Sequence, residues 1–418
     1  MIQFNNSLIK YLVFLLPLSL ITGPLLPELV VFFLITYFFF SSIKQNINYI
    51  FKNNFFKLFI IISLFIIVRN YFSDYFFKNY LNSLFYFRFT IFSLAIYLLD
   101  LENRDLKKIL FYGIIIAYIL LFTDTLFEYF FNERVYGLKS IYNSRISSFF
   151  GDEYIMGSFA VRLLPLAIFS LFWFNIKKSY YYIILFSILL VTGILIILSG
   201  ERAAFLLFFL VCIIFVLLKK FRKFFLIHLI VFLTVFLYLA QNKNIEQRYI
   251  SFLKKDNFTK NEFIFFTEEH HSLMLTSLKI IKSNFFFGTG SKSFSTLCKT
   301  DEFKTITYPS NDIGNEDIGC STHPHNIFLQ VFVEYGIIGI IIYFIILAQV
   351  TFQFFLNIRK YNKNELPIYK NKNLSLTFLY LSLLINIFPL IPSGSLFNNW
   401  FSVILYMPIG FILSVEKK

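Results

Sequence analysis

Residues 321–330 read STHPHNIFLQ, and an almost wholly apolar stretch follows them to about residue 356. Pro324 suits the first turn of a helix, because the N–H that proline lacks has no partner there. The polar segment therefore predicts the entrance of a helix over approximately residues 326–356, long enough to cross a bilayer. His325 is then expected at the membrane surface, where an imidazole is a candidate proton acceptor.

The rest of the chain repeats this apolar pattern. Of the 418 residues, 57% are hydrophobic and 15% are charged, whereas soluble domains usually carry about 25% charged residues. The sequence therefore predicts an all-α integral membrane protein with about 12 transmembrane helices. These are expected at approximately 8–22, 25–42, 58–73, 83–99, 109–130, 154–175, 180–198, 202–218, 224–240, 326–356, 374–391 and 397–415. No cleavable signal peptide is expected, because a second apolar run follows the first at once.

The basic residues indicate the orientation. The net charge is +14, but the basic residues lie mostly in short turns between apolar runs, as the positive-inside rule requires. Nucleic acid is therefore not expected as a partner. With the N-terminus in the cytoplasm, the inward turns hold Arg104, Lys107, Lys108, Lys177, Lys178, Lys219, Lys220, Arg222 and Lys223. The outward turns at 22–25 and 392–396 carry neither Lys nor Arg.

Two outward segments are longer than turns. We expect a single polytopic membrane domain over residues 1–418, with a smaller outer loop at 131–153 and a large outer loop at 241–325. The large loop is expected to contain short helices and to bear the active site, because polar residues gather there. It holds four of the five histidines, namely His270, His271, His323 and His325.

Asn326, Gln330 and Glu334 follow His325 at helical spacing and form one polar stripe. A carboxylate inside a spanning helix is costly unless it faces a polar cavity or a partner. The stripe therefore either faces a site that His325 serves, or only joins helices while His325 is a solvated loop residue. Gly336 and Gly339 predict close helix packing.

Two further segments place arginines at the outer face. Arg202 follows Ser199-Gly200-Glu201 between two apolar runs, where a guanidinium can hold phosphate oxygens; alternatively it is a surface arginine paired with Glu201. Arg145 precedes a helix entrance, and Arg162 lies about two turns into the next apolar run. Arg162 is either an interior anion contact or half of a buried ion pair with Asp152 or Glu153.

The three cysteines have different expected roles. Cys212 lies within an apolar run and predicts simple packing. Cys298 and Cys320 both lie in the large outer loop, where a disulfide can persist. A zinc site is the alternative, although the spacing matches no usual ligand pattern. The Gly288-Thr289-Gly290 segment is either a turn or a cradle for phosphate.

Four segments in this order resemble the O-antigen ligase/O-antigen polymerase family of bacterial membrane glycosyltransferases. They are Arg145…Phe150-Gly151-Asp152-Glu153…Gly157, Ser199-Gly200-Glu201-Arg202, Phe287-Gly288-Thr289-Gly290…Phe294, and His323-Pro324-His325-Asn326…Gln330…Glu334-x-Gly336-x-x-Gly339. The resemblance covers about residues 140–345, and the fourth segment is the most specific.

The resemblance implies a glycosyltransferase of the inner membrane whose active site faces the periplasm. The donor is an undecaprenyl-diphosphate-linked glycan, the acceptor is lipid A-core or a growing glycan, and membrane lipids surround the protein. Neither a metal nor another cofactor is expected. His325 matches the family's general base and Arg202 the arginine that holds the diphosphate. The expected substrate contacts are Arg145, Arg162, His270, His271, Lys292, His323, Asn326 and Glu334.

One departure affects the anion site. Ligases of this family often have a second arginine about eighteen residues before the Gly-x-Gly segment, where this chain has His270 and His271. Arg145, Arg162 or Lys292 are then the candidate replacements. The residues do not separate ligation from polymerisation of repeat units. A flippase of lipid-linked sugars without catalysis is the remaining alternative, although it does not need a histidine-rich outer loop.

Overall fold

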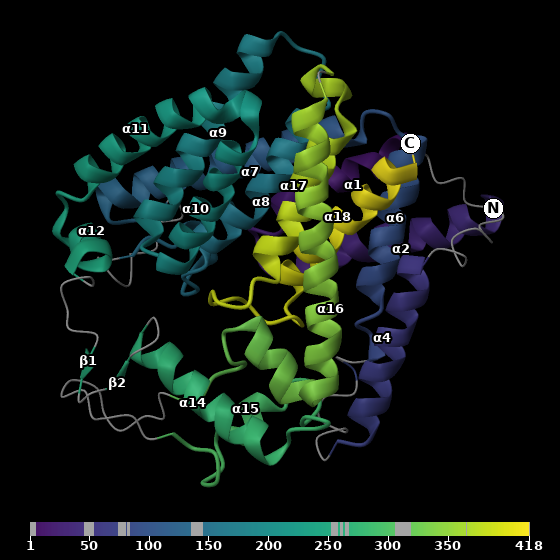
Figure 1. Ribbon diagram of the computed structural model, residues 1–418, viewed down its shortest axis with the longest axis vertical. Coiled ribbons are helices and arrows are strands. Elements are labelled where there is room, and N and C mark those ends of the chain that lie inside the picture. The colour runs from purple at the N-terminus through teal and green to yellow at the C-terminus, as the bar shows by residue number, and fades with distance from the viewer. Residues whose placement is uncertain are drawn as a thin grey trace.

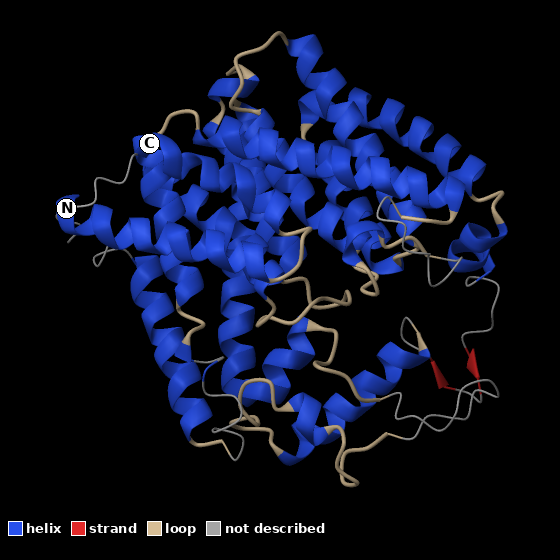
Figure 2. Cartoon of the chain, turned by 180° about the vertical axis from the view of Figure 1, so that it is seen from behind, coloured by secondary structure: helices blue, strands red, loops and turns tan. Residues whose placement is uncertain are grey.

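The computed structural model describes residues 6–45, 54–73, 81, 84–134, 145–251, 258–259, 262–263, 267–305, 319–364 and 366–417. These residues are almost entirely helical (Figures 1 and 2). The only described strands, β1 (Phe258–Thr259) and β2 (Glu262–Phe263), form a short antiparallel pair. Parts of both predicted outer loops, including 135–144 and 306–318, fall outside the described residues. The all-α prediction is thus confirmed.

A helix occupies each of the twelve predicted spans. They are α1 (Asn6–Ser19), α2 (Leu25–Gln45), α4 (Asn54–Tyr71), α6 (Arg88–Glu102), α7 (Leu106–Phe131), α8 (Met156–Leu171), α9 (Lys178–Ser199), α10 (Arg202–Leu217), α11 (Arg222–Leu239), α16 (Ile327–Lys363), α17 (Lys372–Asn386) and α18 (Asn399–Lys417). By length and composition, five described helices can cross a membrane: Leu106–Phe131, Lys178–Ser199, Lys219–Leu239, Ile327–Lys363 and Asn399–Lys417. The count of 12 crossings remains a prediction.

The centre of the bundle is α8. All of its residues except Ser158 are buried, as expected for a helix that is apolar on every side. It packs against α7, α9, α10 and α17. A second tight contact joins α6 to α18, where the Oγ of Ser93 donates to the carbonyl of Tyr406 at 2.8 Å. This bundle supports the segments that contain the candidate site.

Residues 241–325, for which a large outer loop with short helices is predicted, contain four short helical segments among the described residues. They are α12 (Lys243–Glu246), the π-helical turn η3 (Gln247–Ser251), α14 (Glu268–Ser283) and α15 (Phe294–Leu297). Helices α14 and α15 lie beneath the bundle in Figure 1, alongside the beginning of α16. We call α14, α15 and the connected residues 284–305 and 319–326 the lobe. A small core of its own includes Leu273, Ile280, Phe294 and Leu297.

Helix α16 is broken at Gly336, whose φ of 63° and ψ of −158° are not helical. The lobe segment 285–290 replaces the hydrogen bonds that the break removes. The N–H groups of Thr289 and Gly290 donate to the carbonyls of Val333 and Glu334, each at 2.9 Å. The N–H of Ile337 donates to the carbonyl of Phe285 at 2.9 Å. The backbone groups on both sides of the break are therefore satisfied, as buried groups must be.

The structure decides how two groups of glycines at this junction act. Gly336 does not serve helix-helix packing, because a Cβ there would lie 2.4 Å from the carbonyl oxygen of Phe286 in the lobe. The Gly288–Gly290 segment is a turn and not a phosphate cradle. All three of its N–H groups donate to backbone carbonyls, since the N–H of Gly288 donates to Asn284 at 3.0 Å.

The C-terminal end of α4 contacts the same turn. The Nε of Arg69 donates to the carbonyl of Phe287 at 2.6 Å, and its Nη2 donates to the carbonyl of Gly288. The Oγ of Ser73 donates to the carbonyl of Thr289 at 2.6 Å. The N–H of Ser291 donates to the Oδ1 of Asn70 at 2.7 Å. The turn thus joins α4, α16 and the lobe.

We expect Gly336→Ala to lower the free energy of unfolding by about 2–5 kcal/mol, since steric overpacking adds to the cost of a positive φ. Gly151→Ala is the matched control, because Gly151 also has a positive φ (62°) but open space at its Cβ position. Gly151→Ala should lower the free energy of unfolding only by the cost of placing an alanine at positive φ, about 1–2 kcal/mol. Thermal unfolding in detergent measures both. Equal shifts in Tm would contradict the described junction.

Candidate active site

The turn between α9 and α10 positions Arg202. Gly200 ends α9 in the left-handed conformation (φ 66°, ψ 16°), the usual role of glycine at a helix C-terminus. Glu201 is the N-cap residue of α10, and Arg202 is its first residue. The half-buried guanidinium of Arg202 therefore starts from a fixed point at the end of two bundle helices.

The carboxylate of Glu201 caps the neighbouring helix α8. Its Oε1 accepts the N–H of Gly157 at 2.6 Å, and its Oε2 accepts the N–H and the Oγ of Ser158 at 3.2 and 2.6 Å. A negative charge is favourable at a helix N-terminus. A Cβ at Gly157 would lie 2.4 Å from the Oγ of Ser199, so this close approach requires glycine. Glu201 thus serves α8, which the sequence did not predict.

Arg145 lies beside this turn. Its Nη2 donates to the carbonyl of Tyr154 at 3.2 Å, and its Nε to the carbonyl of Ser199 at 3.4 Å. Its guanidinium also lies 4.4 Å from the centre of the Tyr154 ring. Burial lowers the pKa of Arg145, the charge of Glu201 raises it, and the positive charge of Arg248 lowers it. Arg145 is therefore held close to a second guanidinium.

Arg248 is absent from the predicted site residues. It lies in η3, where the hydroxyl of the next residue, Tyr249, donates to the carbonyl of Ile196 in α9 at 2.9 Å. This bond brings Arg248 close enough to act electrostatically on Arg202. The Nε of Arg248 is buried and has no hydrogen-bond acceptor among the described residues. We call Arg145, Arg202 and Arg248 the arginine cluster.

Three histidines meet beside the arginine cluster. The ring centres of His323 and His325 are 4.2 Å apart, and those of His270 and His325 are 5.8 Å apart. His270 begins α14, where its N–H donates to the side chain of the N-cap residue Thr267. Its neighbour His271 is half-buried, with no hydrogen-bond partner for Nδ1 among the described residues. His270, His323 and His325 therefore share one site, and no contact joins His271 to it among the described residues.

His325 is held in place and is not a solvated loop residue. Its φ is 51°, a conformation uncommon for residues other than glycine and found often at functional sites. Its carbonyl accepts the N–H of Ser393 at 2.8 Å. Its Nε2 lies 3.0 Å from the Oγ of Ser321. His323, only 6% exposed, contacts the carbonyl of Ser393 through Nε2 at 3.3 Å.

The environment keeps these imidazoles neutral near pH 7. Burial lowers the pKa of His325 to about 4, with a further contribution from His270. Burial also lowers the pKa of His270 to about 4, and Arg202 and Arg145 oppose its protonation. The pKa of His323 is lowered to about 3, first by burial and then by His325. A neutral imidazole beside fixed positive charges can accept a proton while the charges bind an anion.

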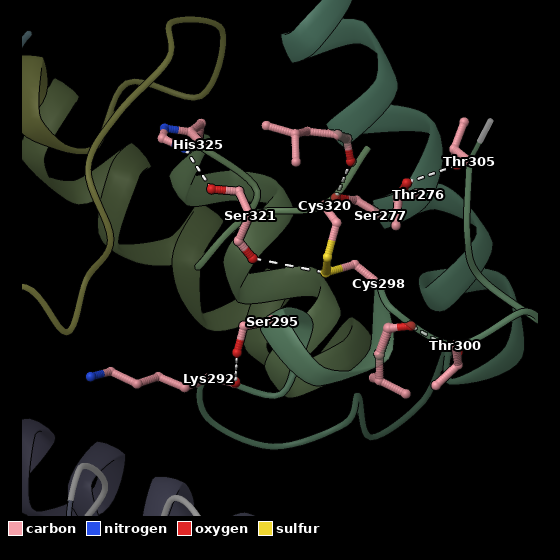
Figure 3. Close-up of a disulfide and its surroundings, with 12 residues drawn as sticks. Thr276, Ser277, Lys292, Ser295, Cys298, Thr300, Thr305, Cys320, Ser321 and His325 are labelled. Carbon is pink, nitrogen blue, oxygen red and sulfur yellow. Dashed lines mark hydrogen bonds between the residues drawn. A yellow bond between two sulfur atoms is a disulfide. The ribbon is translucent and has the colours of Figure 1, made fainter. Parts of the chain in front are cut away.

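A disulfide joins Cys298 to Cys320, as predicted, with a Cα–Cα separation of 5.1 Å. Figure 3 shows it beside Ser321, on the segment that leads to His325. Ser321 follows Cys320 directly, and its hydroxyl contacts the His325 ring. The disulfide therefore restrains the contact that orients His325, and it excludes zinc binding by this cysteine pair. Cys212 is buried in α10, as predicted.

Two predicted substrate contacts have structural partners. Arg162 is 1% exposed, and its Nη1 donates to the carbonyl of Ile385 and the Oδ1 of Asn386, at 2.8 and 3.0 Å. The alternative ion pair with Asp152 or Glu153 is wrong, since both acidic residues are exposed. Asn326 caps α16 by accepting the N–H of Leu329 at 3.0 Å.

The polar stripe on α16 joins segments of the chain. The Nε2 of Gln330 donates to the Oγ of Ser395 and to the Oε1 of Glu334, each at 3.0 Å. The same Oε1 accepts the N–H of Lys292 at 3.0 Å. The stripe thus links the lobe to the segment between α17 and α18. Among the described residues, no group of three or more His, Cys, Asp and Glu side chains is arranged to hold a metal ion.

Cys298→Ser should make the lobe more sensitive to protease, because a disulfide that closes a loop of this size stabilises by about 3 kcal/mol. Limited proteolysis with mass mapping measures the effect, and cleavage is expected within the lobe. Cys212→Ala, which removes the free buried cysteine, is the control and should leave the lobe resistant. Equal resistance of Cys298→Ser and the unmodified protein would show that the lobe does not depend on the disulfide.

Comparison with known proteins agrees with the resemblance in the sequence. Residues 185–344 match the family model described as O-antigen ligase. The match includes two arginines of the cluster, Arg202 and Arg248, together with His270 and His325. A search of curated proteins finds no match to the chain. Over residues 185–344, the chain is therefore similar to the O-antigen ligase family.

Proposed function

We propose that the chain transfers an undecaprenyl-diphosphate-linked glycan to an acceptor hydroxyl at the periplasmic face of the bacterial inner membrane. The observation that carries this proposal is the arginine cluster beside the neutral imidazole of His325. Positive charges that share a partly buried site are costly in free energy unless an anion pairs with them. A diphosphate offers several oxygens to guanidinium groups, which bind phosphate with paired donors.

The chemistry requires little beyond positioning and one proton acceptor. The acceptor oxygen attacks the anomeric carbon, a new C–O bond forms, and the bond from that carbon to the diphosphate oxygen breaks. His325 takes the proton of the attacking hydroxyl, and general base catalysis is typically worth about 10²–10⁴-fold. The arginine cluster stabilises the negative charge that develops on the departing diphosphate. Arg248 and Arg145 then supply the anion contacts that His270 does not.

We expect Arg202→Ala, Arg248→Ala and His325→Ala each to abolish transfer while the protein stays in the membrane. A strain lacking the gene is complemented with each variant, and its surface polysaccharide is resolved on a gel. Arg222→Ala is the charge-matched control. Arg222 is exposed and begins α11, so it lies at the other end of α10 from Arg202, and it donates to the carbonyl of Val216. It should restore the wild-type pattern.

The same gel separates the two related reactions. Loss of all core-attached glycan, with polymer kept on the carrier lipid, indicates a ligase. Retention of a core with one repeat unit indicates a polymerase. Full rescue by Arg202→Ala and His325→Ala would contradict catalysis at this site and favour a transport role.

On the acid side of the pH profile, kcat/KM should fall only at low pH. The kcat/KM of an enzyme reports the pKa values of its free form. His325 accepts a proton only when neutral, and burial lowers its pKa to about 4, so kcat/KM should fall only as pH drops through about 4. At pH 5.5 it should remain near its value at pH 7.5, whereas an ordinary histidine with a pKa of about 6.5 would be only about one-tenth neutral. An acid limb near pH 6.5 would contradict the neutral-imidazole mechanism.

A further inference from the structure

Two separate anchors hold the segment that carries His325. At one end, the disulfide ties Cys320 to Cys298, which ends α15. At the other end, the carbonyl of His325 accepts the N–H of Ser393, from the segment between α17 and α18, at 2.8 Å. Ser321 directly follows the anchored Cys320. The hydroxyl of Ser321 and the ring of His325 are therefore each held by a restrained backbone.

The two ring nitrogens of His325 have different surroundings. Nε2 lies 3.0 Å from the Oγ of Ser321, as the dashed line in Figure 3 marks. Nδ1 makes no hydrogen bond to a described residue and, unlike the Nδ1 of His271, it is not buried. Since Ser321 occupies the Nε2 side of this half-buried ring, a substrate hydroxyl has Nδ1 as its point of contact.

The neighbouring ring of His323 cannot take this role. Its Nε2 lies 3.3 Å from the carbonyl oxygen of Ser393, which can only accept, so Nε2 carries the hydrogen. A neutral imidazole has one donor and one acceptor nitrogen. Its Nδ1 must then accept the hydroxyl of Thr322 at 3.0 Å. Both nitrogens of His323 are therefore engaged within the protein.

The role of a base decides the tautomer of His325. Nδ1 can take a proton only if the hydrogen of the neutral ring is on Nε2, and that hydrogen then points to the Oγ of Ser321. A hydroxyl oxygen can accept this bond, both before and after Nδ1 takes a proton. If Ser321 donated instead, the hydrogen would lie on Nδ1, and the nitrogen that a substrate contacts would have no lone pair. The bond at one ring nitrogen thus sets the chemistry of the other.

We propose that Ser321 is a positioning residue for the transfer reaction, whose Oγ accepts the Nε2–H of His325 and so presents the lone pair of Nδ1 to the acceptor hydroxyl. This assignment rests on the proposed function. The proton passes from the acceptor hydroxyl to Nδ1 as the new C–O bond forms, and Ser321 keeps its own proton. A base oriented by a third group is a recurring arrangement in enzymes.

Solid-state NMR tests the tautomer without any transfer reaction. The full-length protein is labelled with ¹⁵N-histidine and placed in liposomes at pH 7, and comparison with His325→Ala identifies the signals of His325. We expect the hydrogen on Nε2 in the wild type and a mixture of both tautomers in Ser321→Ala. A hydrogen on Nδ1 of His325 in the wild type overturns the assignment, whatever the reaction of the protein.

Kinetics of the same variants test the consequence. Ser321→Ala should lower kcat by about tenfold or more, which is part of the roughly 10²–10⁴-fold that a positioned base contributes, with the KM for donor nearly unchanged. Ser321→Thr keeps a hydroxyl and should recover most of the loss. Ser295→Ala is the matched control, because Ser295 is a half-buried serine of the lobe whose Oγ donates to the carbonyl of Lys292 at 3.3 Å. It should keep the wild-type kcat.

Ser321→Asp separates positioning from a merely structural role. The titratable groups that face the His325 ring are His270 from α14 and His323 from its own segment. A carboxylate beside Nε2–H favours the charged imidazolium, so the acid fall of kcat/KM should move up from about pH 4 by about 1–3 pH units. Wild-type kcat in Ser321→Ala, or an unmoved acid fall in Ser321→Asp, overturns the assignment. Absence of transfer by the wild type instead contradicts the proposed function.

Discussion

The break in α16 at Gly336 is the constraint on which the lobe depends. A helix interrupted inside a membrane protein exposes N–H and carbonyl groups that must be satisfied internally. The lobe satisfies them with its own backbone, through Thr289, Gly290 and the carbonyl of Phe285. This exchange fixes the turn before Lys292 and places it against Glu334. The break in α16 and the turn of the lobe therefore form one junction.

The arginine cluster brings three guanidinium groups from separate segments of the chain into electrostatic contact. The carboxylate of Glu201 accepts three hydrogen bonds from donors of α8. Its negative charge stabilises that helix terminus and still acts on Arg145. The cluster acts on the neutral imidazole of His270. This combination suits a reaction that releases an anionic leaving group and needs a base.

The sequence was sufficient for features that depend on local pattern. Apolar runs located the helices, and the two outer cysteines predicted the disulfide. Residues whose position depends on contacts between distant segments were not predictable in this way. Arg248 reaches the site because Tyr249 bonds to α9, and nothing in its local sequence indicates that bond. Arg162 looked like an anion contact, but the end of α17 provides its partners. Gly336 suggested helix packing, whereas its contact is the lobe.

The central claim is that the chain itself catalyses transfer from a diphosphate-linked donor. The most direct measurement is the release of undecaprenyl diphosphate by the purified protein in nanodiscs, supplied with the lipid-linked glycan, with and without acceptor. We expect release only when acceptor is present, in equal amount to the glycosylated product. No release with a well-folded protein and a competent acceptor, or movement of intact donor across the bilayer in its place, would contradict the claim.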